Sequence, residues 1–130
     1  MATDLTMLVW SAVLCLALPV TYLVGRAQVP GGLAWGFGNR ERPLAVPAWA
    51  GRAQRAHANL VENLAPFAAL VLAAHASGRA NAATALGATL FFWGRVAHAA
   101  VYIAGIPYLR TAVFFVATAG ELVILAQLLG

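Results

Sequence analysis

The sequence predicts an all-α integral membrane protein, a four-helix bundle with left-handed up-down packing. Three observations support this fold class. Of the 130 residues, 62% are hydrophobic and 9% are charged, and the mean hydropathy is +0.81, which is too apolar for an ordinary soluble domain. Four apolar stretches can each cross a bilayer, which takes about 20 helical residues. The connections between the later stretches are short, as expected for antiparallel neighbours.

The first predicted span covers about residues 5–25 and contains no charge. Pro19 lies inside it, and a transmembrane helix tolerates such a kink where its neighbours satisfy the freed carbonyl. Asp4 is placed to cap the start of this helix. No basic segment precedes the span, so we expect it to remain in the mature protein.

A cytoplasmic connection is predicted at residues 26–51. Prolines and glycines recur through it and are expected to interrupt any helix, and residues 40–42 form a small charged cluster. Its aromatic rings are of the kind found at the level of the lipid headgroups. These rings belong to Trp35, Phe37 and Trp49.

Three further spans complete a single domain that occupies residues 1–130. They cover about residues 52–77, 82–104 and 108–129. Alanine and glycine are frequent in them and allow helix backbones to approach closely in a membrane.

The arginines predict the orientation in the membrane. The chain has eight arginines, no lysine and a formal net charge of +4, and Arg79 alone lies in the second connection. By the positive-inside rule, the first and third connections face the cytoplasm and both termini lie outside. Because the positive charge belongs mostly to one membrane face, nucleic-acid binding is not expected. The arginines on that face are Arg26, Arg40, Arg42, Arg52, Arg55 and Arg110.

Neither a disulfide nor a metal site is expected. Cys15 is the only cysteine, which excludes an intrachain disulfide, and we interpret it as a small packing residue. His57 and His75 are roughly 27 Å apart along one helix, so they cannot share a metal ion.

A polar stripe runs along the second span. Arg55, Asn59, Glu62 and Pro66 follow one another at spacings of four, three and four residues, which places them on one helical face. A carboxylate inside a bilayer costs several kcal/mol unless it faces a bundle interior or a water-filled cavity. Glu62 is therefore expected to face protein or ligand.

A second polar stripe lies on the third span, where Arg95, His98 and Tyr102 share a face. Counted along the helices from their cytoplasmic ends, Glu62, Arg95 and Glu121 all fall about 14 to 17 Å into the membrane. Arg95 could neutralise one or both carboxylates as a structural lock, or the charges could bind a ligand. The two roles are compatible, because buried charges need partners in either case.

Together, the segments R-A-Q-R-A-H-A-N-L-V-E-N-L-A-P-F and R-V-A-H-A-A-V-Y, followed by Arg110, resemble the MAPEG family, the membrane-associated proteins in eicosanoid and glutathione metabolism. The resemblance covers nearly the whole chain and rests on the specific register R-x-x-x-N-x-x-E-x-x-x-P. It implies a four-helix protomer in a homotrimer, with glutathione bound as co-substrate between subunits. The segment G-N-R-E-R-P resembles bacterial members, which implies a bacterial inner membrane.

The resemblance also implies roles for individual residues. Arg110 matches the arginine that acts on the thiol and is the implied catalytic residue. Asn63 departs from the pattern, because some eukaryotic members have tyrosine at this position. The implied glutathione-binding residues are Arg55, Asn59, Glu62, Arg95, His98 and Tyr102.

Three functions are compatible with these residues. The first is a glutathione-dependent transferase or peroxidase whose activated thiolate conjugates or reduces hydrophobic electrophiles that arrive from the lipid. The second is a small proton-coupled multidrug transporter, which is disfavoured because the first span lacks an acidic residue. The third is a non-enzymatic scaffold in which the ionic layer sets the helix register. For the first function, glutathione and other low-molecular-weight thiols are both compatible with the residues.

Overall fold

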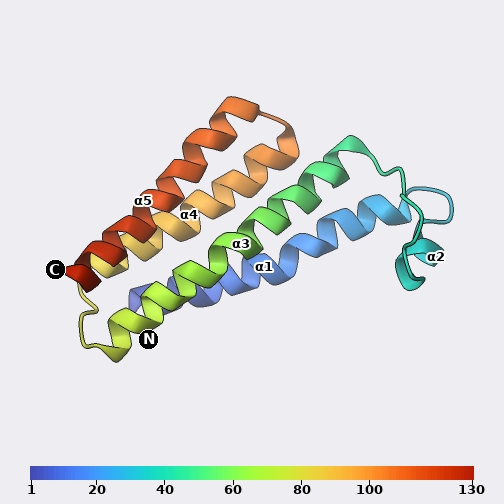
Figure 1. Cartoon of the computed structure of the whole chain (residues 1–130). Helices are drawn as coiled ribbons and strands as arrows, with labels where there is room; N and C mark the ends of the chain where they lie inside the picture. The colour runs from blue at the N-terminus through green and yellow to red at the C-terminus, as the bar shows by residue number, and fades with distance from the viewer.

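The computed structural model describes all 130 residues, which form five helices and no strand (Figure 1). Four helices are long: α1 (Thr3–Ala27), α3 (Ala48–Ala76), α4 (Ala82–Ala104) and α5 (Pro107–Leu129). A short helix, α2 (Gly32–Phe37), lies between α1 and α3. Each long helix is long and apolar enough to cross a membrane. The chain is therefore a multi-pass integral membrane protein, and the predicted all-α class with four long apolar helices is confirmed.

The first connection contains a helix where the sequence predicted none. Its glycines flank α2 and do not prevent it from forming: Gly31, with φ 72°, precedes the helix, and Gly38 ends it in an extended conformation. Glycine adopts a positive φ at little cost because it has no Cβ. Within α2, the indole nitrogen of Trp35 donates a hydrogen bond to the carbonyl of Arg42, so the following segment folds back on the helix.

The long helices alternate in direction and form two pairs (Figure 1). One pair is α1 with α3, and the other is α4 with α5, which make the most extensive contact. α4 also touches α1 and α3, whereas α5 touches α3 but not α1. The two pairs diverge toward the end of the molecule where α2 lies, and both termini lie at the opposite end (Figure 1).

The core is a narrow layer of side chains between the two pairs. Phe67 of α3 stacks on Phe91 of α4 with ring centroids 3.8 Å apart, and both side chains are fully buried. Only 24 of the 130 residues are buried, and large apolar side chains such as Leu16, which is 78% exposed, cover the outside. An apolar exterior of this kind suits a hydrocarbon environment.

Small residues set the contact between α4 and α5. A Cβ atom built on Gly87 would lie 2.5 Å from the carbonyl oxygen of Gly120, and one built on Gly94 would lie 2.9 Å from the backbone nitrogen of Ala117. Side chains at these positions would therefore force the helices apart. The contact follows the rule that small residues allow membrane helices to pack closely.

The prediction that Asp4 caps α1 is wrong. The N-cap residue is Ala2, and Asp4 lies buried in the first helical turn. Its Oδ1 atom is 2.8 Å from Nε2 of His75, and its Oδ2 atom accepts a hydrogen bond from the hydroxyl of Thr84 at 3.0 Å. A buried carboxylate needs such partners. Asp4 therefore connects α1 to α3 and α4 instead of capping its own helix.

The arginines divide between the two ends of the bundle as the sequence indicated. Arg79 lies at the end with the termini, where its Nη1 atom donates to the carbonyls of Gln127 and Leu128. Six other arginines lie at the opposite end of the bundle. They are in the last turn of α1, in the connection that contains α2, near the start of α3 and in the first turn of α5. Which end faces the cytoplasm stays a prediction.

We expect Gly120→Val to lower the thermal stability of the protein in detergent. The added side chain would overlap the backbone of α4, and such overpacking typically costs about 1–3 kcal/mol. Ala119→Val is the matched control, because Ala119 is the exposed neighbour on the same helix. Equal melting temperatures of the two variants would contradict the close packing of α4 on α5.

Candidate functional site

A sharp turn between α4 and α5 brings two predicted site residues together. Gly105 ends α4 in the left-handed conformation, with φ 82°, and Pro107 occupies the first turn of α5, where its missing N–H is not needed. The turn sets Arg110, at the start of α5, against Tyr102, near the end of α4. The Arg110 guanidinium carbon is 4.7 Å from the centroid of the Tyr102 ring.

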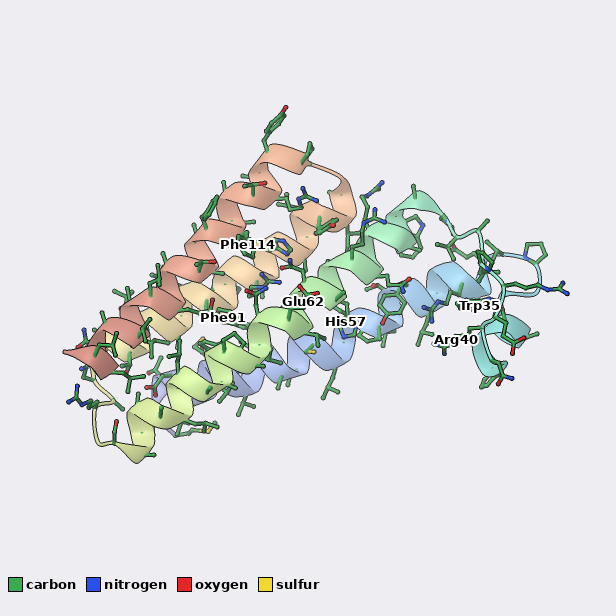
Figure 2. The ribbon with its side chains drawn as sticks, in the orientation of Figure 1. Trp35, Arg40, His57, Glu62, Phe91 and Phe114 are labelled. Atoms are coloured by element: carbon green, nitrogen blue, oxygen red, sulfur yellow. The ribbon has the colours of Figure 1, made fainter.

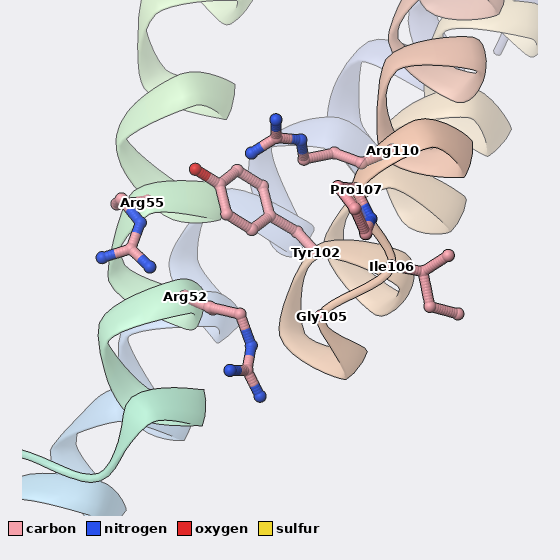
Figure 3. Close-up of a pocket in the computed structure, with 7 residues that line it drawn as sticks. All are labelled: Arg52, Arg55, Tyr102, Gly105, Ile106, Pro107 and Arg110. Atoms are coloured by element: carbon pink, nitrogen blue, oxygen red, sulfur yellow. The ribbon is translucent and has the colours of Figure 1, made fainter.

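A cavity of about 180 Å³ opens between this turn and the start of α3 (Figure 3). The ring of Tyr102 lies between Arg110 and Arg55, and the Arg55 guanidinium carbon is 6.0 Å from the ring centroid. Three arginines and no carboxylate line the cavity, so it favours an anion. The lining residues are Arg52, Arg55, Tyr102, Gly105, Ile106, Pro107 and Arg110.

Arg52 is a lining residue that the sequence pattern did not assign to the site. Its Nε atom donates a hydrogen bond to the carbonyl of Ile103 at 2.9 Å, which satisfies a carbonyl at the end of α4 and orients the guanidinium group. The third arginine of the cavity is thereby held between α3 and α4. One signal could have revealed it: Arg52 precedes Arg55 by one helical turn and so shares its face.

A second cavity, of about 310 Å³, shares Tyr102 and Arg110 with the first. His98, 3% exposed, packs edge-on against Tyr102 with ring centroids 5.4 Å apart. Four of the predicted site residues therefore line one cavity. The complete lining is Asn59, His98, Tyr102, Arg110, Thr111 and Phe114.

Arg95 lies beneath these cavities and is 1% exposed. Its Nη2 atom donates a hydrogen bond to Oδ1 of Asn59 at 2.7 Å, while its Nε atom and Oε1 of Glu121 are buried without partners. No ion pair joins Arg95 to Glu121 or to Glu62. Arg95 and Glu121 are nevertheless close enough for their charges to attract one another. The structural lock considered from the sequence therefore lacks a direct ion pair within the chain, where Arg95 binds Asn59.

Glu62 lies at the middle of α3, on the surface of the protomer (Figure 2). It forms no ion pair within the chain. Arg55 and Pro66, on the same stripe, are also exposed, whereas Asn59 is half-buried against Arg95. An exposed carboxylate in a membrane span needs a partner. This face of α3 is thus exposed and contains a carboxylate without a partner in the chain.

Cys15 and His57 lie together between α1 and α3, apart from these cavities. The Cys15 sulfur is 3.8 Å from Nε2 of His57, whose Nδ1 atom is 2.9 Å from the hydroxyl of Tyr22. His57 therefore has polar neighbours at both ring nitrogens. No group of three or more His, Cys, Asp or Glu side chains is placed to hold a metal ion.

Comparison with known families gives a match over nearly the full length of the chain. The model of the MAPEG family matches residues 6–130, a range that includes every residue lining the two cavities. No curated protein and no solved structure is significantly similar to the chain.

We expect Asn59→Ala to destabilise the protein by about 1–3 kcal/mol, because it leaves a buried guanidinium group without its hydrogen-bond acceptor. The measurement is thermal unfolding in detergent. Asn39→Ala is the matched control, because Asn39 is an exposed asparagine in the connection between α2 and α3, away from Arg95. Equal losses in the two variants would contradict the supporting role of Asn59.

Proposed function

This chain belongs to the MAPEG family, and on that premise we propose that it is a membrane-bound glutathione-dependent transferase or peroxidase. One observation carries the proposal: Arg55 and Arg110 flank the ring of Tyr102 in a cavity lined by three arginines and no carboxylate. The family match supports thiol chemistry in general. The cavity supports a small anionic ligand.

The charges of glutathione match the charges around the two cavities. Glutathione has two carboxylates, one ammonium group and one thiol. Guanidinium groups bind carboxylates through paired, charge-assisted hydrogen bonds, so Arg52 and Arg55 are proposed to hold the carboxylates. Glu62, on the open face of α3, takes the ammonium group.

The deeper residues hold the binding groups in position. Asn59, fixed by Arg95 at 2.7 Å, presents its remaining hydrogen-bonding groups toward the second cavity. His98 packs edge-on against the ring of Tyr102 and limits its movement. Tyr102 in turn separates the guanidinium groups of Arg55 and Arg110, so that each is directed at a different part of the ligand.

Arg110 is proposed to act on the thiol. A free cysteine thiol has a pKa of about 8.5, and a fixed cation beside it lowers that value and raises the thiolate fraction at neutral pH. In conjugation to an epoxide, the sulfur attacks a ring carbon, the carbon–oxygen bond breaks and the alkoxide takes a proton. With a hydroperoxide, the sulfur takes the terminal oxygen, an alcohol leaves, and a second glutathione converts the sulfenic acid into a disulfide and water.

The membrane and a second copy of the chain complete the proposed site. Hydrophobic electrophiles, such as epoxides, quinones or lipid hydroperoxides, concentrate in the bilayer that surrounds the helices. Arg55 and Glu62 are exposed on one face of α3. We propose that a neighbouring protomer of a homotrimer covers this face, which places glutathione between subunits.

We expect glutathione to produce a saturable thiolate absorbance with the detergent-purified protein at neutral pH, and Arg110→Ala to lose that signal. The substitution removes the cation that stabilises the thiolate. Arg79→Ala, at the other end of the bundle, is the control and should retain the signal. If neither glutathione nor another small thiol gives a signal with any of these proteins, the non-enzymatic scaffold is favoured.

We expect Arg55→Ala to weaken glutathione binding roughly tenfold or more, which is the effect of losing a charge-assisted hydrogen bond. Isothermal titration of detergent-purified protein measures the affinity. Arg110→Ala should bind glutathione nearly as well as the unmodified protein, because its proposed role is in activation. An unchanged affinity in Arg55→Ala would overturn the assignment of Arg55 as a carboxylate-binding residue.

A further inference from the structure

A third cavity, of about 400 Å³, lies between the end of α1 and α2. It shares no lining residue with the two cavities of the thiol site. Its lining combines two arginines, several large apolar side chains and no carboxylate. The lining residues are Leu23, Arg26, Gly32, Leu33, Gly36, Phe37 and Arg40.

Arg26 is a buried cation without an anionic partner. It is 8% exposed and forms no ion pair, and its guanidinium carbon is 4.9 Å from the ring centroid of Tyr22 and 5.2 Å from that of Trp35. The side-chain nitrogen atoms of Arg26 are not fully enclosed by protein, and Arg26 is one of the residues that line the cavity. A buried charge normally requires an opposite charge or hydrogen bonds. Within the chain, the Arg26 guanidinium group has only the two aromatic rings as partners.

Arg40 supplies a second cation on the same cavity. Its Nε and Nη2 atoms donate hydrogen bonds to the carbonyl of Gly36 at 3.1 and 3.0 Å, which holds the guanidinium group against α2. Its guanidinium carbon is 5.5 Å from the ring centroid of Trp35. The indole of Trp35, labelled with Arg40 in Figure 2, is therefore in contact with both Arg26 and Arg40, and both arginines line the cavity.

The rest of the cavity is apolar and open to the surroundings. Leu23 is 48% exposed, Leu33 is 62% exposed and Phe37 is 92% exposed. They lie where a membrane-spanning helix ends, the level at which aromatic rings and lipid headgroups meet. Exposed apolar side chains grouped beside cations indicate a binding site for a molecule with both an anionic and an apolar part.

We propose that this cavity binds the anionic head of a membrane amphiphile. Its phosphate or carboxylate would lie against Arg26 and Arg40, and its acyl chain would follow Leu23, Leu33 and Phe37. The bound head supplies the anion that Arg26 lacks and attaches α2 to α1. Two sources offer this chemistry, an anionic phospholipid of the bilayer and a free fatty acid. The site is independent of the proposed thiol chemistry.

The test is native mass spectrometry of the full-length protein in non-ionic detergent, with added phosphatidylglycerol, phosphatidylcholine or oleate. We expect phosphatidylglycerol or oleate to bind about tenfold more tightly than phosphatidylcholine, because the choline ammonium group offsets the charge of its phosphate and is repelled by the two arginines. Retention of phosphatidylglycerol assigns the site to a phospholipid, and retention of oleate alone assigns it to a free fatty acid. Equal retention of all three, or of none, overturns the proposal.

Single substitutions test whether the anionic ligand binds in this cavity. Arg26→Gln should reduce the affinity for the anionic ligand to that for phosphatidylcholine, whereas Arg42→Gln, an exposed arginine outside the cavity, should leave it unchanged. Because Arg26 is buried, Leu33→Glu provides a second test at an exposed position: it adds a negative charge to the cavity, and Leu33→Gln is its neutral control. A preference for anions that survives both Arg26→Gln and Leu33→Glu overturns the assignment to this cavity.

Discussion

The hydrogen bond between Arg95 and Asn59 joins α4 to α3 beneath the cavities, and the geometry of the candidate site depends on it. Both residues interrupt otherwise apolar spans, where an unpaired polar group is costly. Their pairing sets the position of α4 relative to α3. Tyr102, two turns further along α4, is thereby placed opposite Arg55 and within reach of Arg110.

The two ends of the bundle differ in whether their charged side chains have polar partners within the chain. At the end with the termini, polar groups satisfy one another: Asp4 binds His75 and Thr84, and Arg79 binds the carbonyls that end α5. At the other end, the helix pairs diverge (Figure 1) and the arginines have no carboxylate partner. Four of them have aromatic rings beside them: Arg26, Arg40, Arg55 and Arg110. A stable closed end and an open, positively charged end are suited to a protein that binds small anions at one membrane face.

The open end contains two separate kinds of cavity. The cavities around Tyr102 are formed by three spans and contain polar groups at several depths, which suits a small, highly charged molecule such as glutathione. The cavity beside α2 is more apolar and lies at the edge of the bundle, which suits an amphiphile. Both use arginine with an aromatic ring, because the ring stabilises the cation without neutralising it.

Much of this protein was determined by the sequence alone. The hydropathy predicted the four long helices, and the polar register on the second and third spans indicated the MAPEG family, which the match over residues 6–130 confirms. The same register named Arg55, Asn59, His98 and Tyr102, which line a cavity, together with Glu62 and Arg95, which do not. Arg110, which also lines both cavities, came from the family resemblance. Periodicity suffices here because residues three or four apart must share a helical face.

Tertiary structure alone decided which polar groups pair. Equal depth in the membrane suggested that Arg95 meets Glu62 or Glu121, but the rotation of α3 about its axis directs Asn59 to Arg95 and leaves Glu62 exposed. Glu121, on α5, lies close to Arg95 without forming an ion pair with it. Asp4, read as a cap, finds partners more than 70 residues away in the chain. Periodicity along one helix cannot report the rotation of that helix against its neighbours, and packing sets that rotation.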